Sequence, residues 1–144
     1  MGRQGWFGKK MSYQIYSDGA SRGNPGPSGI GAVILKDGKV VHEIAQYIGE
    51  VTNNVAEYEA LLAALDYCVK KKLSPVEILA DSQLMIRQLT GHYKVKHPNI
   101  IPLYEKAKEY LVHLEVTGFK HVPREENKHA DRLSNEGIDD HFSQ

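Results

Sequence analysis

The chain has 144 residues, with 18 Lys or Arg and 18 Asp or Glu, so its formal net charge is zero and its length suits one domain. No apolar run approaches the about 20 residues of a membrane-spanning helix, and a single cysteine, Cys68, excludes an internal disulfide. A cytoplasmic protein is therefore expected, and the charge balance neither supports nor excludes a nucleic-acid partner.

The first part of the chain predicts three strands in meander order. Residues 12–17, 29–35 and 40–48 have β-like patterns, and the Asp37-Gly38 pair predicts a two-residue hairpin between the second and third. Between the first and second strands, "SDGASRGNPGPSG" is rich in turn-forming residues. Asp18, at the predicted C-terminal end of the first strand, is either a turn residue or a functional acid beside a loop that presents backbone to a ligand.

Helical periodicity begins at residue 54. Apolar residues recur at helical spacing over 54–72, and Thr52 and Asn53 are candidate N-caps. A short buried strand is expected over 76–80, followed directly by Asp81. Helices are then predicted over 82–89 and 102–114, a strand over 115–122, and a last helix over 127–137.

This order predicts an α/β fold: a mixed five-stranded sheet, with three antiparallel strands and then two parallel additions, and helices on both faces. We expect residues 1–11 to form a flexible N-terminal extension, residues 12–138 to form one domain, and residues 139–144 to form a C-terminal tail.

Four acidic residues lie at the ends of predicted elements. Asp18 and Asp81 end strands, while Glu57 and Asp131 lie in the first turns of helices. If the first and fourth strands are parallel neighbours, these carboxylates meet at one edge of the sheet. Their repulsion would raise their pKa values, and the usual reason for such a cluster is a divalent metal. Two Mg²⁺ ions about 3.5–4 Å apart can hold the attacking and leaving oxygens of a phosphodiester.

Each of the four acids also has an ordinary structural explanation. Asp18 before Gly19 fits a turn, Glu57 and Asp131 fit the positive ends of helix dipoles, and Asp81 fits a helix N-cap. Four acids with unrelated structural roles would seldom all fall at positions that one fold brings together. The four positions taken jointly therefore favour a shared site. The serines lack a G-x-S-x-G context, the histidines lack zinc spacing, and no Walker loop is present.

Four segments, "SDGASRGNPGPSGIGAVI", "TNNVAEYEALLAAL", "ADSQLMIRQLTG" and "VPREENKHADRLSN", closely resemble the four blocks of type I ribonuclease H, in the family's order, from about Tyr13 to Gly137. The resemblance implies the ribonuclease H-like fold and an endonuclease that cuts the RNA strand of RNA–DNA hybrids. It further implies two Mg²⁺ (or Mn²⁺) ions, products with 5′-phosphate and 3′-hydroxyl ends, and a monomer.

The resemblance also implies roles for individual residues. The catalytic and metal-binding carboxylates would be Asp18, Glu57, Asp81 and Asp131. The implied substrate contacts are Gly19, Ser21, Gly23, Asn24, Thr52, Asn53, Asn54 and Gln83. Glycines allow a close approach of backbone to the nucleic acid, and an RNA 2′-hydroxyl both donates and accepts hydrogen bonds. Helix capping is an alternative role for Asn53 and Asn54.

Two features depart from the family pattern. The loop "PREENKHAD" lacks the Gly-rich segment with a catalytic histidine, and His129 points about 200° away from Asp131 on a helix, so we predict a surface histidine. Arg124 and Glu126 are better candidates for assisting proton transfer or product release. Residues 91–99 stand in place of a long basic handle, which predicts weaker hybrid binding with a modest salt dependence.

Two other functions remain open on the same fold. One is a relative with a different nucleic-acid substrate, such as a DNA-strand transferase or an exonuclease. The residues that argue against it, because they suit a groove holding one RNA and one DNA strand, are Asn24, Asn53, Asn54 and Gln83. The other is a non-catalytic hybrid-binding module. Four carboxylates argue against it, since a pure phosphate binder would gain nothing from negative charges at its contact surface.

Overall fold

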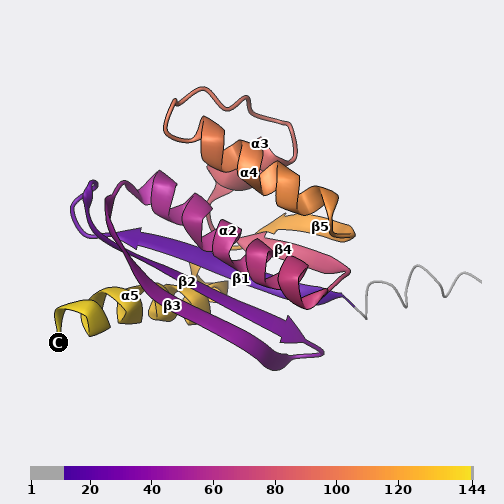
Figure 1. The fold of residues 1–144 in the computed structure, drawn as a ribbon, viewed down its shortest axis with the longest axis horizontal. Coiled ribbons are helices and arrows are strands. Elements are labelled where there is room, and N and C mark those ends of the chain that lie inside the picture. Colours follow the sequence, from indigo (N-terminus) through magenta and orange to yellow (C-terminus); the bar gives the residue numbers. More distant parts are fainter. Residues whose placement is uncertain (1–11, 144) are drawn as a thin grey trace, which may run out of the picture.

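The computed structural model describes residues 12–143, and the predicted extension over residues 1–11 lies outside them. Its elements are β1 (Tyr13–Ser21), β2 (Gly26–Lys36), β3 (Lys39–Val51), α2 (Asn53–Lys71), β4 (Val76–Ala80), α3 (Gln83–Leu89), α4 (Ile101–Val112), β5 (Val116–His121), η1 (Arg124–Glu126) and α5 (Lys128–Phe142) (Figure 1). None of the helices in the described residues combines the length and apolar character needed to cross a membrane.

The strands form one mixed sheet in the order β3-β2-β1-β4-β5. β1, β2 and β3 pair antiparallel, whereas β4 pairs parallel with both β1 and β5. Asp37 and Gly38 both have positive φ, of 52° and 77°, as a two-residue hairpin turn between right-twisted strands requires. The predicted sheet, three antiparallel strands followed by two parallel ones, is therefore confirmed.

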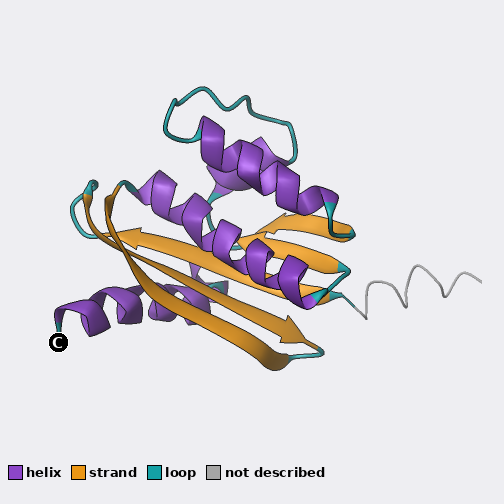
Figure 2. Cartoon of the chain, in the orientation of Figure 1, coloured by secondary structure: helices purple, strands orange, loops and turns teal. Residues whose placement is uncertain are grey.

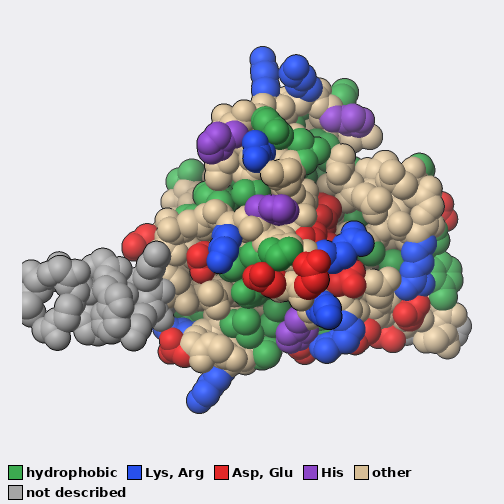
Figure 3. All heavy atoms as spheres, turned by 180° about the vertical axis from the view of Figure 1, so that it is seen from behind, with side chains coloured by type: hydrophobic (Ala, Val, Ile, Leu, Met, Phe, Trp, Pro, Cys, Tyr) green, Lys and Arg blue, Asp and Glu red, His purple; other side chains and the backbone are tan. Residues whose placement is uncertain are grey.

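Helices cover both faces of the sheet (Figure 2). α2 lies on one face together with α3 and α4, and α5 lies on the other, against β1, β2 and β3. Seen from behind, Asp and Glu side chains lie close to Lys and Arg side chains near the middle of the molecule (Figure 3). This face therefore carries side chains of both signs, with acidic and basic groups next to one another (Figure 3).

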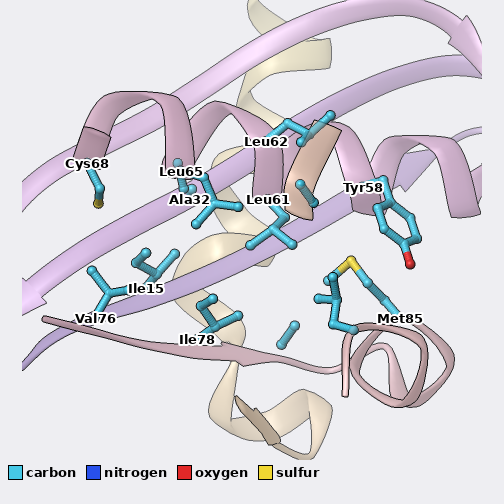
Figure 4. Packing of buried hydrophobic residues seen from close by; sticks show 14 of the residues in the cluster. Ile15, Ala32, Tyr58, Leu61, Leu62, Leu65, Cys68, Val76, Ile78 and Met85 are labelled. Carbon is cyan, nitrogen blue, oxygen red and sulfur yellow. The ribbon is translucent and has the colours of Figure 1, made fainter. Parts of the chain in front are cut away.

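The main apolar core lies between α2 and the sheet (Figure 4). Leu61, Leu65 and Cys68 of α2 face Ile15 and Ile78 of the sheet, and all five are fully buried. Removing such side chains from water is the main stabilising term in a domain of this size. The apolar periodicity over residues 54–72 therefore corresponds to the face of α2 that packs on the sheet.

Several elements extend beyond their predicted ends. β2 and β3 pair from Gly26 opposite Val51 to Lys36 opposite Lys39, so both strands are longer than the predicted ranges 29–35 and 40–48. α5 continues to Phe142, five residues past the predicted end at Gly137. Gly137 does not stop the helix; a Cβ there would lie 2.6 Å from the backbone nitrogen of Gln46, so this glycine permits close packing on β3.

The contact between α5 and β2 also depends on glycine. Gly31 lies under the first turn of α5, and a Cβ at this position would stand 2.1 Å from the carbonyl oxygen of Ala130. Gly29 has the same relation to the carbonyl oxygen of Ser134, at 2.2 Å. The run of glycines in "SGIGAVI" therefore brings a helix backbone directly onto the sheet.

Gly31→Ala should destabilise the fold by about 2 kcal/mol or more, because the added methyl group meets backbone atoms that cannot rotate away. Urea unfolding followed by circular dichroism measures the change. Gly118→Ala is the matched control: a Cβ at Gly118 of β5 meets nothing within 4 Å, so its stability should shift by less than about 0.5 kcal/mol. Equal effects of the two substitutions would contradict the proposed packing role.

Candidate active site

Three carboxylates from separate elements meet at one end of the sheet. Asp18 comes from β1, Glu57 from α2 and Asp81 from the residue after β4, and one ligand oxygen of each lies within 4.8 Å of the others. Asp18 is buried, with 7% of its surface exposed, and the other two are half-buried. The predicted convergence of these three acids is present in the structure.

Asp18 lies inside β1 and not at its end, which corrects the prediction. β1 continues to Ser21 because its pairing with β2 extends from Asp18 opposite Gly31 to Ser21 opposite Ser28. The parallel pairing with β4, in contrast, stops at Ser17 opposite Ala80. Asp18 and Asp81 are thus the first residues beyond that ladder, which places them side by side as expected.

Gly19 holds the start of α2 against β1. Its N–H donates to Glu57 Oε1 at 2.5 Å, and a Cβ on Gly19 would stand 2.2 Å from the backbone carbon of Ala56. The prediction gave this glycine the task of approaching nucleic acid, but its missing side chain makes room for the protein's own helix. Glu57 is the fifth residue of α2, just past the first turn in which it was predicted.

Asp131 joins the group from the first turn of α5, as predicted. It lies close enough to Asp18 to help raise the pKa of that carboxyl. The start of α5 is held in place by Asn127, which is fully buried and donates from Nδ2 to the carbonyl oxygen of Ser17 at 2.9 Å. Sequence reasoning missed Asn127, although its position just before a helix that carries a predicted catalytic acid was a usable signal.

The packing of these acids shifts their protonation. Burial, followed by the negative charge of Glu57, raises the pKa of Asp18 well above its ordinary value, and Asp81 adds to the effect. Burial likewise raises the pKa of Glu57, against the lowering influence of Asp18, of the Gly19 N–H and of Arg124. The site in this state therefore disfavours full ionisation and would gain from a positive charge.

A divalent cation fits this group of atoms. Carboxylate oxygens are the ligands that hard cations such as Mg²⁺ prefer, and the site offers them from Asp18, Glu57 and Asp81. Asp81 Oδ2 is buried and has no hydrogen-bond partner among residues 12–143, which is costly unless another group completes its coordination. The chemistry of the donor set and this unsatisfied oxygen both point to a metal site.

The predicted substrate-contact residues lie next to this cluster and hold one another in place. Asn24 Oδ1 accepts from the N–H of Asn53 at 2.8 Å, and Asn53 Oδ1 accepts from the N–H of Ser21 at 3.0 Å. Thr52 caps α2 by accepting from the N–H of Val55, so of the two predicted N-cap candidates Thr52 is confirmed, and Asn53 is the first residue of the helix. The turn between β1 and β2 is thus fastened to the start of α2.

A hollow of about 300 Å³ opens beside this turn. Its lining residues are Asn24, Thr52, Asn53, Asn54, Val55, His97 and Ile100. Asn54 also lines a smaller hollow together with Glu57 and Ser82, which connects the region to the carboxylates. The two other predicted contacts lie at helix and turn positions: Gln83 is the first residue of α3, and Gly23 has a positive φ of 132° in the β1–β2 turn.

The candidate residues in and after the loop before α5 have different surroundings. His129 Nε2 contacts Glu43 Oε2 of β3 on a partly exposed surface, as expected for a surface histidine. Arg124 lies in η1, near enough to Glu57 to lower its pKa, whereas the charge of Glu126 acts on Tyr16. Sequence reasoning passed over His121 at the end of β5, whose Nε2 lies 3.3 Å from the carbonyl oxygen of Asp81.

Comparisons with known proteins agree on one family. The family model described as reverse transcriptase-like matches residues 16–137. The bifunctional protein Rv2228c of Mycobacterium tuberculosis is 44% identical over 131 residues, which cover 90% of this chain but only 36% of that relative. This chain thus spans about a third of the length of that relative. Ribonuclease H of Methylococcus capsulatus is 34% identical over 142 residues, with 87% and 88% covered.

A solved structure has the same fold. The crystal structure of LC11-RNase H1 in complex with an RNA/DNA hybrid matches with a TM-score of 0.86 and 45% identity, over 91% of this chain and 99% of that one. At this level of identity and coverage the two chains share the same overall fold.

The raised pKa of Asp18 predicts how the stability of the metal-free protein depends on pH. The folded chain keeps a proton on Asp18 at pH values where the unfolded chain has lost it, so the free energy of unfolding should fall as the pH rises above 3.8. In EDTA we expect a loss of about 1 kcal/mol or more between pH 5 and pH 8, measured by urea unfolding.

Asp18→Asn should reduce this loss, because the substituted side chain carries no charge at either pH. Mn²⁺ should restore the stability of the unsubstituted protein at pH 8 and have little effect on the variant. A free energy of unfolding that is constant between pH 5 and pH 8 in EDTA would contradict the desolvated cluster.

Proposed function

The chain belongs to the ribonuclease H family, and we propose that it is an endoribonuclease that hydrolyses the RNA strand of RNA–DNA hybrids, leaving 5′-phosphate and 3′-hydroxyl ends. The observation that carries the proposal is the meeting of Asp18, Glu57 and Asp81, with Asp131 beside them, at one end of the sheet. A metal-assisted phosphodiester hydrolase needs such a group of carboxylates, and a fold held together by its apolar core does not.

The proposed roles of the acids follow from their surroundings. Asp18, Glu57, Asp81 and Asp131 would hold the metal, for which we propose two Mg²⁺ ions, with Mn²⁺ as an alternative. When bound, the ions would supply Lewis-acid polarisation and neutralise negative charge near the scissile phosphate. The Gly19 N–H keeps Glu57 oriented through its hydrogen bond at 2.5 Å, so that this carboxylate needs no reorganisation when the substrate arrives.

The proposed hybrid groove lies along the β1–β2 turn and the start of α2. Asn24, Asn53 and Ser21 are already hydrogen-bonded to one another, which fixes the backbone that would face the sugar-phosphate strands. Asn54 and Gln83 are exposed, and their side-chain amides suit groove contacts to both strands. A hydroxyl-reading groove of this kind is how a protein distinguishes RNA from DNA.

Arg124 and Glu126 remain our candidates for assisting proton transfer or product release. Arg124 supports the ionised form of Glu57, and a guanidinium keeps its charge at every working pH. We further propose that the protein acts as a monomer in the cytoplasm; the buried, unpaired Cys68 is compatible with a reducing compartment.

Cleavage of matched duplexes tests the proposed function. RNA/DNA, RNA/RNA and DNA/DNA duplexes of one sequence, each incubated with Mg²⁺, Mn²⁺ or EDTA, should give cleavage of the RNA strand of the hybrid in the presence of either ion only. Asp81→Asn is the matched control: it should abolish cleavage, because it removes one ligand charge, while hybrid binding stays within a few-fold. Equal cleavage of DNA/DNA, or an active Asp81→Asn variant, would reject the proposal.

The loop before α5 gives a separate prediction. Arg124→Ala and Glu126→Gln should lower turnover more than His129→Ala, whose effect should stay below about tenfold because the His129 ring pairs with Glu43. Steady-state cleavage of the hybrid measures turnover of the three variants, and single-turnover cleavage at saturating enzyme separates the chemical step from product release. If His129→Ala caused the largest loss, the assignment of a surface role to this histidine would be wrong.

A further inference from the structure

Arg22, in the turn between β1 and β2, is fastened to the last helix by both ends of its guanidinium group. Nη1 donates to Asp139 Oδ1 at 2.8 Å, and Nη2 donates to Asn135 Oδ1 at 3.0 Å. Both partners lie on α5, more than one hundred residues further along the chain. The turn that carries Gly23 and Asn24 is thus connected to the helix that carries Asp131.

The contact with Arg22 fixes the orientation of the Asn135 amide. Because Oδ1 accepts from the guanidinium, Nδ2 faces the other way, toward Asp131 one turn earlier on the same helix. Nδ2 donates to the carbonyl oxygen of Asp131 at 3.0 Å and lies 3.5 Å from its Oδ1. Without Arg22 the side-chain amide of Asn135 could rotate by half a turn and place its oxygen next to the Asp131 carboxylate. The two oxygens would then repel each other.

We propose that Asn135 and Arg22 are positioning residues that set the orientation of the Asp131 carboxylate and couple it to the substrate-contact turn. The inference rests on the proposed function. The contacts run from Asp131 through Asn135 to Arg22, and from the same turn through Asn24 to Asn53 at the start of α2, the helix that carries Glu57. The turn between β1 and β2 therefore links the two helices that deliver acids to the site.

The exposure of the Arg22 and Asp139 side chains indicates that their contact orients Asp131 and adds little to the stability of the fold. The side chains of Arg22 and Asp139 are 45% and 65% exposed, and ion pairs this exposed add little to the free energy of unfolding. Arg22 suits the task because its rigid, planar fork can hold two acceptors at once, which a lysine cannot. Small displacements of the groups that orient a metal ligand typically lower activity or metal affinity by about tenfold or more.

Five variants test the proposal: Asn135→Ala, Arg22→Ala, the double variant that combines these two, Arg22→Lys and Asn135→Asp, with Glu136→Gln as the matched control. Glu136 lies on the same helix and pairs only with Arg132 at the surface. Hybrid cleavage is followed at saturating Mn²⁺ to separate kcat from KM, and Mn²⁺ binding is measured by calorimetry without substrate. Circular dichroism confirms folding, and Asn135→Asp, which keeps the Arg22 contact, replaces Asn135→Ala should that variant unfold.

We expect Asn135→Ala and Arg22→Ala each to lower kcat by about tenfold with KM within about twofold, and to weaken Mn²⁺ binding. The double variant should be no worse than either single one, because both act through one contact. Asn135→Asp should also lose activity, since it loses the donor to Asp131, and Arg22→Lys should recover little. Glu136→Gln should behave like the unsubstituted protein.

An increase in KM for Arg22→Ala at constant kcat would overturn the proposal, because it would indicate a direct contact of Arg22 with a substrate phosphate. Unchanged Mn²⁺ affinity in both alanine variants would also overturn it. If the unsubstituted protein cut no hybrid, the proposed function would be wrong. The Mn²⁺ titrations would still test the positioning role, because they do not depend on cleavage.

Discussion

The close approach of two helix starts to β1 around Asp18 is the constraint on which the rest of the site depends. Gly31 pairs with Asp18 across the β1–β2 ladder, and its missing side chain leaves room for the first turn of α5. Gly19, the next residue of β1, leaves room in the same way for the backbone of α2 at Ala56 and Glu57. Because contacts between backbones admit no Cβ, two glycines beside one aspartate set where the acids of both helices stand.

Bringing these carboxylates together costs electrostatic free energy. Burial and like charge raise the pKa of Asp18, so the acids oppose folding while they are without a cation. The apolar core between α2 and the sheet supplies the opposing stability, through side chains such as Leu61, Leu65 and Ile78 that are fully buried. The site and the core thus share one face of α2, with Glu57 near its start and Leu61 and Leu65 one and two turns further along.

The β1–β2 turn has a structural role in addition to its proposed contact with the hybrid. Asn24 fastens it to α2 and Arg22 fastens it to α5, so the turn-rich segment between the two strands is held at both sides. Its glycines and its asparagine serve the protein's own geometry first. A binding surface that is fixed in advance loses less conformational entropy when a partner docks on it.

The sequence by itself determined the order of the elements, the hairpin at Asp37-Gly38, the N-cap at Thr52 and the four acids, because these depend on local periodicity, turn chemistry and motif spacing. Only the tertiary structure decided where β1 and α5 end, since the pairing of Ser21 with Ser28 and the packing of Gly137 on Gln46 join distant segments. For the same reason the contacts of Asn127 and His121, and the Arg22–Asn135 contact, could not be recognised in advance, although the position of Asn127 just before a helix with a predicted acid was a signal. Their partners lie 40 or more residues away, and no local pattern encodes a contact that exists only after the sheet and its helices have packed.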